Sequence, residues 1–173
     1  MTRGLWLTGA SAPRTIHDFG GFDHGAWVPM MHLYPQADVP MVQLSMPADL
    51  DARTAAALGA ALRPLREDGV LVIGSGSLTH NLYELDPAAG EKPSPEAQTF
   101  VESVSAALAG GGDAAAFAKG LMTTPGLARV HPTVEHLLPL PFARAAAGES
   151  ITVTRLEGGY RYGALSMHAF VFA

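Results

Sequence analysis

The sequence has 173 residues, of which 48% are hydrophobic and 16% are charged, a composition typical of a folded globular protein. Its net charge is -5 and it has no long basic run, which argues against a nucleic acid or an anionic membrane as partner. It contains no cysteine, so any metal must be held by histidine and carboxylate side chains. We expect one domain, and the lack of a signal peptide or a bilayer-spanning apolar stretch makes a cytoplasmic location the default expectation.

The N-terminal part alternates short apolar runs with loops. Residues 3–9 are typical of a short strand, and residues 12–21 form a loop, because they contain a proline and a pair of glycines. This loop carries His17. Asp23 is a suitable N-cap for a short helix over residues 26–34.

Two apolar runs in the middle of the chain, at 39–46 and 70–74, predict buried strands. The segment between them, 51–66, has leucines at helical spacing and is predicted to be an amphipathic helix. A strand, a crossover helix and a second strand form a βαβ unit, whose strands are parallel. The expected fold class is therefore α/β, with a central, mainly parallel or mixed sheet flanked by helices.

The second half is predicted to be mainly helical and to end in antiparallel strands. The expected elements are a helix capped by Ser94 and ended by the glycines at 110–112, a short helix over 114–121, a helix from Thr133 to Gly148 that Pro141 kinks or shortens, and two strands at 151–156 and 162–172. Residues 157–159, Glu-Gly-Gly, separate the two strands.

Two histidines stand out as candidates for chemistry. The glycine-rich stretch that starts at Gly74 follows a predicted strand and delivers His80 to the end of the sheet where ligands bind in open α/β folds. Alternatively, the glycines only form a turn and His80 packs locally. His136 follows Glu135, and an imidazole beside a carboxylate suits a mononuclear metal site. The alternative is a solvated glutamate and a packed histidine, and His131, before a proline, could be either kind of residue.

Five stretches, taken together and in order, resemble the LigB-type class III extradiol ring-cleaving dioxygenases, in particular the 4,5-DOPA dioxygenase-like branch. They are Thr-Ile-His-Asp-Phe-Gly-Gly at 15–21, Phe-Asp-His-Gly-Ala-Trp-Val-Pro at 22–29, the run at 33–45, Gly-Ser-Gly-Ser-Leu-Thr-His-Asn-Leu at 74–82, and His-Pro-Thr-Val-Glu-His-Leu-Leu-Pro-Leu at 131–140. The resemblance covers nearly the whole chain.

This resemblance implies an α/β fold and a non-haem metal, Fe(II) for catalysis and often zinc in isolated proteins, that binds a catecholic substrate while O2 opens the ring beside the diol. It assigns His80 to the metal or to the catalytic base, and His136 with Glu135 to a later metal-ligand position. His24 resembles a catalytic residue that contacts substrate or oxygen, and His17 lies in a segment resembling part of the substrate pocket. A base with a pKa near neutrality, together with imidazole and carboxylate ligands, suits such chemistry.

The sequence departs from the family pattern in two places. The N-terminal motifs that supply two metal-binding histidines in the family are missing, and so is a segment that the relatives insert between Gly21 and Phe22. Three interpretations follow. The protein is a dioxygenase of reduced size in which His17 or His24 replaces a ligand, a non-catalytic relative that binds an aromatic ligand or a partner, or a half-site fragment completed by another chain. An uncovered sheet edge would also favour a homo-oligomer.

Overall fold

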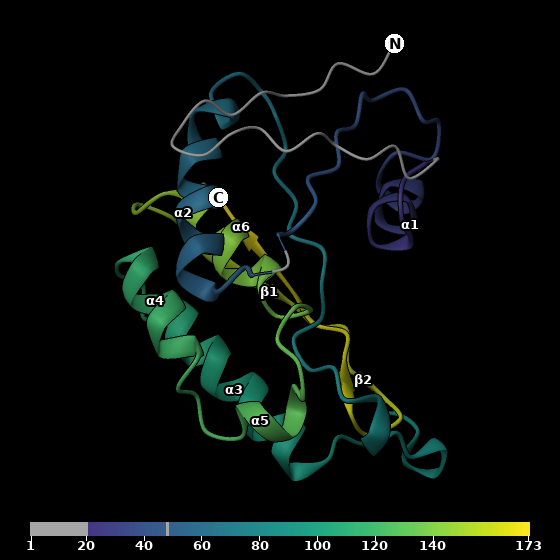
Figure 1. Ribbon diagram of the computed structural model, residues 1–173. Coiled ribbons are helices and arrows are strands. Elements are labelled where there is room, and N and C mark those ends of the chain that lie inside the picture. Colours follow the sequence, from purple (N-terminus) through teal and green to yellow (C-terminus); the bar gives the residue numbers. More distant parts are fainter. Residues whose placement is uncertain (1–20, 48) are drawn as a thin grey trace. The chain divides into compact units, whose positions relative to one another are not determined.

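The computed structural model describes residues 21–47 and 49–173 (Figure 1). The chain divides into two compact units, Met1–Pro47 and Ala48–Ala173, and each is described by itself. The strand predicted at 3–9 and the loop that carries His17 lie outside the described residues. No helix within the described ranges is long and apolar enough to cross a membrane.

In the first unit, helix α1 (His24–Leu33) begins at the predicted cap. The Asp23 carboxylate accepts a hydrogen bond from the Ala26 backbone N–H at 3.2 Å and another from the Gln43 amide at 2.6 Å, so it joins the helix to the following segment. The sequence predicts a strand over that segment, 39–46, but the structure has no strand there, so the prediction is wrong. A strand requires a neighbour that completes its ladder of hydrogen bonds, and no such neighbour lies within the described part of this unit.

The second unit contains the remaining helices. In chain order they are α2 (Ala52–Leu62), the 3-10 turns η1 (Arg63–Arg66), η2 (Leu82–Glu84) and η3 (Pro87–Ala89), then α3 (Pro95–Ala109), α4 (Ala114–Leu121), α5 (Leu127–Val130) and α6 (Pro139–Ala147). The predicted helices at 51–66, from Ser94, and at 114–121 are confirmed. Each begins at a capping residue whose side chain accepts a hydrogen bond from the backbone N–H three residues further on. The capping residues are Asp51, Ser94 and Asp113.

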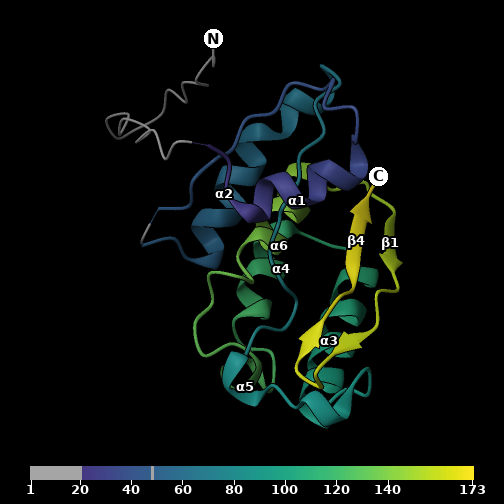
Figure 2. The ribbon, with the colours of Figure 1, turned by 90° about the vertical axis from the view of Figure 1, so that its right-hand side faces the viewer.

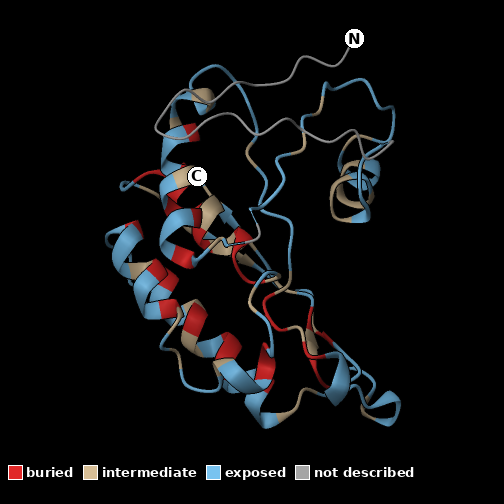
Figure 3. Ribbon diagram, in the orientation of Figure 1, coloured by how far each residue is buried: buried red, intermediate tan, exposed pale blue. Residues whose placement is uncertain are grey.

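Two hydrophobic clusters hold this unit together (Figure 3). The first is built on the buried face of α3: Phe100, Val101, Val104 and Leu108, packed with Leu78, Ala97, Leu121, Val130, Leu137 and Tyr160. The second joins α2, α4 and α6 through six alanines and one leucine: Ala52, Ala55, Ala56, Ala114, Ala118, Leu138 and Ala145. Alanine faces let these helices pack closely, which holds α6 against α2 and α4.

The C-terminal strands form a hairpin that lies beside α3 (Figure 2). Strand β1 (Val153–Leu156) pairs antiparallel with β4 (Ala169–Phe172), and β2 (Tyr160–Arg161) pairs antiparallel with β3 (Leu165–Ser166). The antiparallel pairing is confirmed. The chain reverses at 162–164 rather than at 157–159, because Tyr162 and Gly163 adopt positive φ angles of 53° and 73°.

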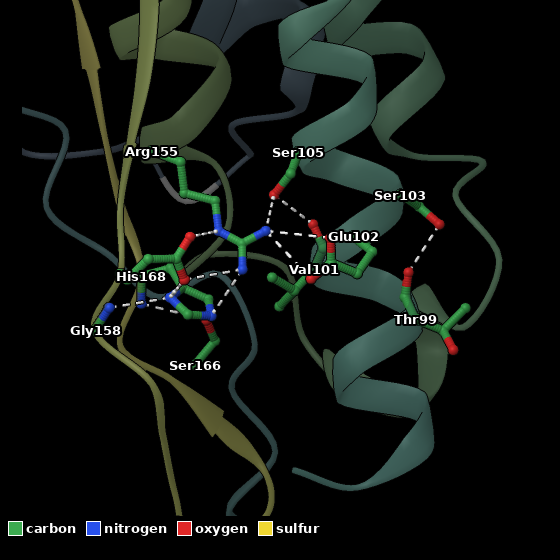
Figure 4. Close-up of polar contacts among 10 residues, drawn as sticks. Thr99, Val101, Glu102, Ser103, Ser105, Arg155, Gly158, Ser166 and His168 are labelled. Carbon is green, nitrogen blue, oxygen red and sulfur yellow. Dashed lines mark hydrogen bonds and ion pairs between the residues drawn. The ribbon is translucent and has the colours of Figure 1, made fainter.

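An ion-pair network attaches the hairpin to α3 (Figure 4). The Arg155 guanidinium, on β1, is 3.2 Å from the Glu102 carboxylate and donates to the Ser105 hydroxyl at 3.2 Å. On its other side the guanidinium faces the Glu157 carboxylate at 2.9 Å and the buried ring of His168 at 3.3 Å.

The structure departs from three predictions for this unit. The run at 70–74 forms no strand, and the described residues contain two small antiparallel sheets instead of a central parallel one. Like the run at 39–46, this run has no neighbouring strand among the described residues to complete a ladder of hydrogen bonds. The helix expected from Thr133 begins only at Pro139, because proline has no N–H to donate and is favoured at a first helical position. Pro141 then falls in the first turn and causes no break.

Candidate functional site

The glycine-rich turn rests directly on the chain that leads into α6. A Cβ atom at position 74 would lie 2.2 Å from the Pro139 carbonyl oxygen, and one at position 76 would lie 2.2 Å from the His136 carbonyl oxygen. Only glycine permits so close an approach. It allows the Ser77 N–H to donate to the His136 carbonyl at 2.8 Å. The two glycines are therefore required by tertiary packing, and they bring the segment after Gly76 against the segment that carries His136.

This packing brings two of the predicted site residues together. The rings of His80 and His136 are stacked, with centroids 3.7 Å apart and planes inclined by 29°. Glu135 adds a carboxylate, whose Oε1 lies 3.8 Å from His136 Nε2. The hydroxyl of Thr133 donates to the same carboxylate at 2.7 Å. The side chains of His136 and Glu135 are 39% and 53% exposed, and His80 is half-buried.

The surroundings set the protonation of the pair. Burial lowers the pKa of His80, and the nearby ring of His136 lowers it further, while Glu135 acts in the opposite direction. The hydrogen bond from Thr133 lowers the pKa of Glu135. At neutral pH the site therefore contains a neutral His80 imidazole, which can accept a proton, beside an ionised carboxylate.

Buried polar side chains on both sides of His80 hold the turn. The Thr79 hydroxyl, which is fully buried, donates to the Ala164 carbonyl and accepts from the Ser166 N–H, both at 2.8 Å. The Asn81 amide donates to the Arg129 carbonyl at 2.7 Å. The sequence pattern alone does not single out Thr79 and Asn81, nor does it decide the role of His131, which is buried. The signal of Thr79 and Asn81 in the sequence is a run of polar residues between the leucines at 78 and 82.

The other two predicted site residues precede the second unit in the chain. His24 is the first residue of α1, in the first unit, and His17 lies outside the described residues. The roles proposed for both stay predictions.

The geometry of the two rings bears directly on metal binding. A metal ion lies in the plane of each imidazole that binds it, about 2 Å from the nitrogen. The planes of two stacked rings inclined by 29°, with centroids 3.7 Å apart, do not meet so close to both rings. Across residues 21–47 and 49–173 no three His, Cys, Asp or Glu side chains gather closely enough to hold a metal. His80, His136 and Glu135 as arranged do not fit a metal ion bound by all three.

Comparisons with known proteins agree on one family. Residues 11–172 match the family described as the catalytic LigB subunit of aromatic ring-opening dioxygenase. The 4,5-DOPA dioxygenase extradiol of Beta vulgaris is 38% identical over 152 residues, which is 88% of this chain and 56% of that protein. The protein of the same name from Escherichia coli K12 is 30% identical over 207 residues, covering 96% of this chain and 76% of that protein.

The fold agrees as well. The crystal structure of an uncharacterized protein from Escherichia coli K12 superimposes with a TM-score of 0.75 at 34% sequence identity, covering 87% of this chain and 62% of that chain. The present chain therefore spans a little over half of the Beta vulgaris protein and less than two thirds of the solved structure. With a family match over nearly its whole length, the chain belongs to the LigB family of aromatic ring-opening dioxygenases.

Proposed function

We propose that this protein takes part in the extradiol opening of a catecholic, DOPA-like ring by O2. The observation that carries the proposal is the stacked pair of His80 and His136 beside Glu135, in a chain of the LigB family. Family membership is consistent with a metal cofactor. Fe(II) is the metal we propose for catalysis, with zinc as a substitute in isolated protein, and His24 and His17 are proposed to contact the substrate.

The described residues supply the proton-handling part of such a reaction. A catechol hydroxyl must lose its proton before the ring is opened, and a neutral imidazole is a suitable acceptor. His80 is kept neutral by burial and by His136, and it is anchored on both sides by Thr79 and Asn81. His80 is accordingly proposed as the base, and His136 with Glu135 as the groups that face the metal.

A second candidate function is favoured by the incomplete set of metal donors. The protein would then be a non-catalytic relative that binds an aromatic ligand, or one half of a site completed by a second copy of the chain. The apolar run before the glycine turn supports a second copy, because Val70, Leu71 and Ile73 are 45%, 60% and 41% exposed. An exposed run of this kind is unusual on a protein that functions as a monomer.

The experiment that separates these functions is metal loading. Protein is purified, stripped, reloaded anaerobically with Fe(II), and analysed for bound iron, as wild type and as the variants His80→Ala and His136→Ala. His32→Ala, which changes an exposed histidine of α1, is the matched control. If the proposal holds, the wild type, the control and His80→Ala bind about one iron per chain, and His136→Ala loses it. Catechol added with O2 then yields a ring-opened product with the wild type and the control, but not with His80→Ala, which lacks the base.

Two other outcomes contradict parts of this proposal. Iron that binds equally to all four proteins would mean that His136 is not a ligand. Specific iron binding without turnover of any catechol would reject the enzymatic function and leave the ligand-binding function.

A further inference from the structure

The ring of His131 lies beneath the turn that carries His80. Only 2% of this residue is exposed, and its Nε2 is 2.9 Å from the Leu78 carbonyl oxygen. The ring also meets the edge of Phe100, with centroids 5.9 Å apart. A carbonyl oxygen can only accept a hydrogen bond, so His131 carries its proton on Nε2 and donates it to Leu78.

The backbone beside His131 holds the same turn at a second point. The His80 N–H donates to the Val130 carbonyl at 2.9 Å, and the His131 N–H donates to the Leu127 carbonyl at 2.8 Å. The end of α5 therefore holds the turn at Leu78 and at His80. Only four residues separate His131 from His136, so the same short segment positions both members of the stacked pair.

The hydrogen bond distinguishes this histidine from an ordinary core residue. Burial lowers the pKa of His131 and keeps the ring neutral. Nδ1 is buried and makes no hydrogen bond within the described residues, so a polar ring at this position is costly unless Nε2–H is needed. An apolar side chain would fill the space as well, but it would leave the buried Leu78 carbonyl without a partner.

We propose that His131 is a positioning residue, which through its Nε2–H bond to the Leu78 carbonyl sets the position of the His80 ring against His136. Its effect on turnover rests on the proposed function; its effect on ring geometry does not. His131 acts through the backbone of the turn and transfers no proton in the reaction.

The test compares two substitutions of similar size. In His131→Gln the amide nitrogen can take the place of Nε2 and donate to Leu78, whereas His131→Leu keeps the volume and removes the donor. The geometric readout is the nuclear Overhauser effect between the His80 and His136 rings in protein with isotope-labelled histidine. We expect this signal in the wild type and in His131→Gln, and its loss in His131→Leu.

A buried histidine whose ring bonds to Arg155 and Gly158, and not to the turn, separates position from stability. The side chain of His168 is 3% exposed, so His168→Leu should lower the melting temperature while it leaves the ring-to-ring signal unchanged. In iron-loaded enzyme, kcat should fall about 100-fold in His131→Leu, with little change in KM, because a reacting group misplaced by about 1 Å costs that much. His131→Gln should restore most of kcat.

Three results would overturn the proposal. The first is a ring-to-ring signal that persists in His131→Leu, and the second is its loss in His131→Gln as well as in His131→Leu. The third concerns the wild type alone and remains decisive if His131→Leu does not fold: long-range proton–nitrogen spectra that place the proton of His131 on Nδ1. If no catechol is turned over by the wild type, the proposed function fails, while the signal still decides the role of His131.

Discussion

Replacing Gly76 by alanine is the most direct test of how the site is built. The added Cβ would lie 2.2 Å from the His136 carbonyl oxygen, more than 1 Å inside ordinary contact, and a backbone atom cannot move aside as a flexible side chain can. Gly76 does not have a positive φ, so the substitution tests this contact and not backbone strain. Overpacking costs about 1–3 kcal/mol, and the hydrogen bond from Ser77 to His136 is worth about 1 kcal/mol more. We expect a loss of about 2–4 kcal/mol in the free energy of unfolding.

Gly120→Ala is the matched control. Gly120 lies in helix α4, has no positive φ, and a Cβ there would meet no atom within 4 Å. This substitution should therefore stabilise the protein by about 0.5–1 kcal/mol through helix propensity. Urea unfolding of both variants measures the difference, and the ring-to-ring signal of His80 and His136 should weaken only in Gly76→Ala. Equal stability of Gly76→Ala and wild type would refute the close packing of the turn on the start of α6.

Two further predictions concern a buried arginine and a buried histidine ring outside the candidate site. Arg144 is 1% exposed, and its guanidinium donates to the carbonyls of Gly148 at 2.6 Å and Gly112 at 2.5 Å. Because lysine cannot make these two hydrogen bonds at once, Arg144→Lys should lower the free energy of unfolding by about 1–3 kcal/mol. An unchanged midpoint of urea unfolding would contradict this. Burial, and to a smaller extent the charge of Arg155, lower the pKa of His168 below its usual 6.5. The unfolded chain therefore takes up a proton at a higher pH than the native chain does. The stability that the neutral ring contributes above pH 6.5 is lost as the pH falls. His168→Gln should therefore show a smaller loss of stability between pH 7 and pH 5 than the wild type, in melting curves recorded across that range.

The elements that sequence predicts well here are those decided by neighbouring residues. Helix α3 is the clearest case, because Ser94, Pro95 and an apolar face at helical spacing are all local signals. The two apolar runs at 39–46 and 70–74 show the limit. Their composition is that of strands, but whether a strand forms depends on a partner elsewhere, which a pattern within the run does not contain.

The same limit applies to the site. The sequence identified His80, His136 and Glu135 as candidates from their residue types and the family resemblance, and the structure brings these three together. It did not predict the stacking of the rings, because that geometry depends on Gly74 and Gly76 lying against backbone far along the chain. The roles of Thr79 and His131 were missed for the same reason, since their partners become visible only in the folded state.

The two deficits of the candidate site lie on the same stretch of chain. Within the described residues, the stretch after Gly76 brings His80 to a site with too few metal donors, and the stretch before Gly74 exposes apolar side chains. A second copy that covered the apolar run could also bring donors to His80, so one association would remedy both deficits. Under this interpretation iron affinity should rise with protein concentration, because metal and partner bind the same assembled state. Iron affinity that is independent of concentration, in a protein that remains monomeric, would instead mean that a single chain completes the site.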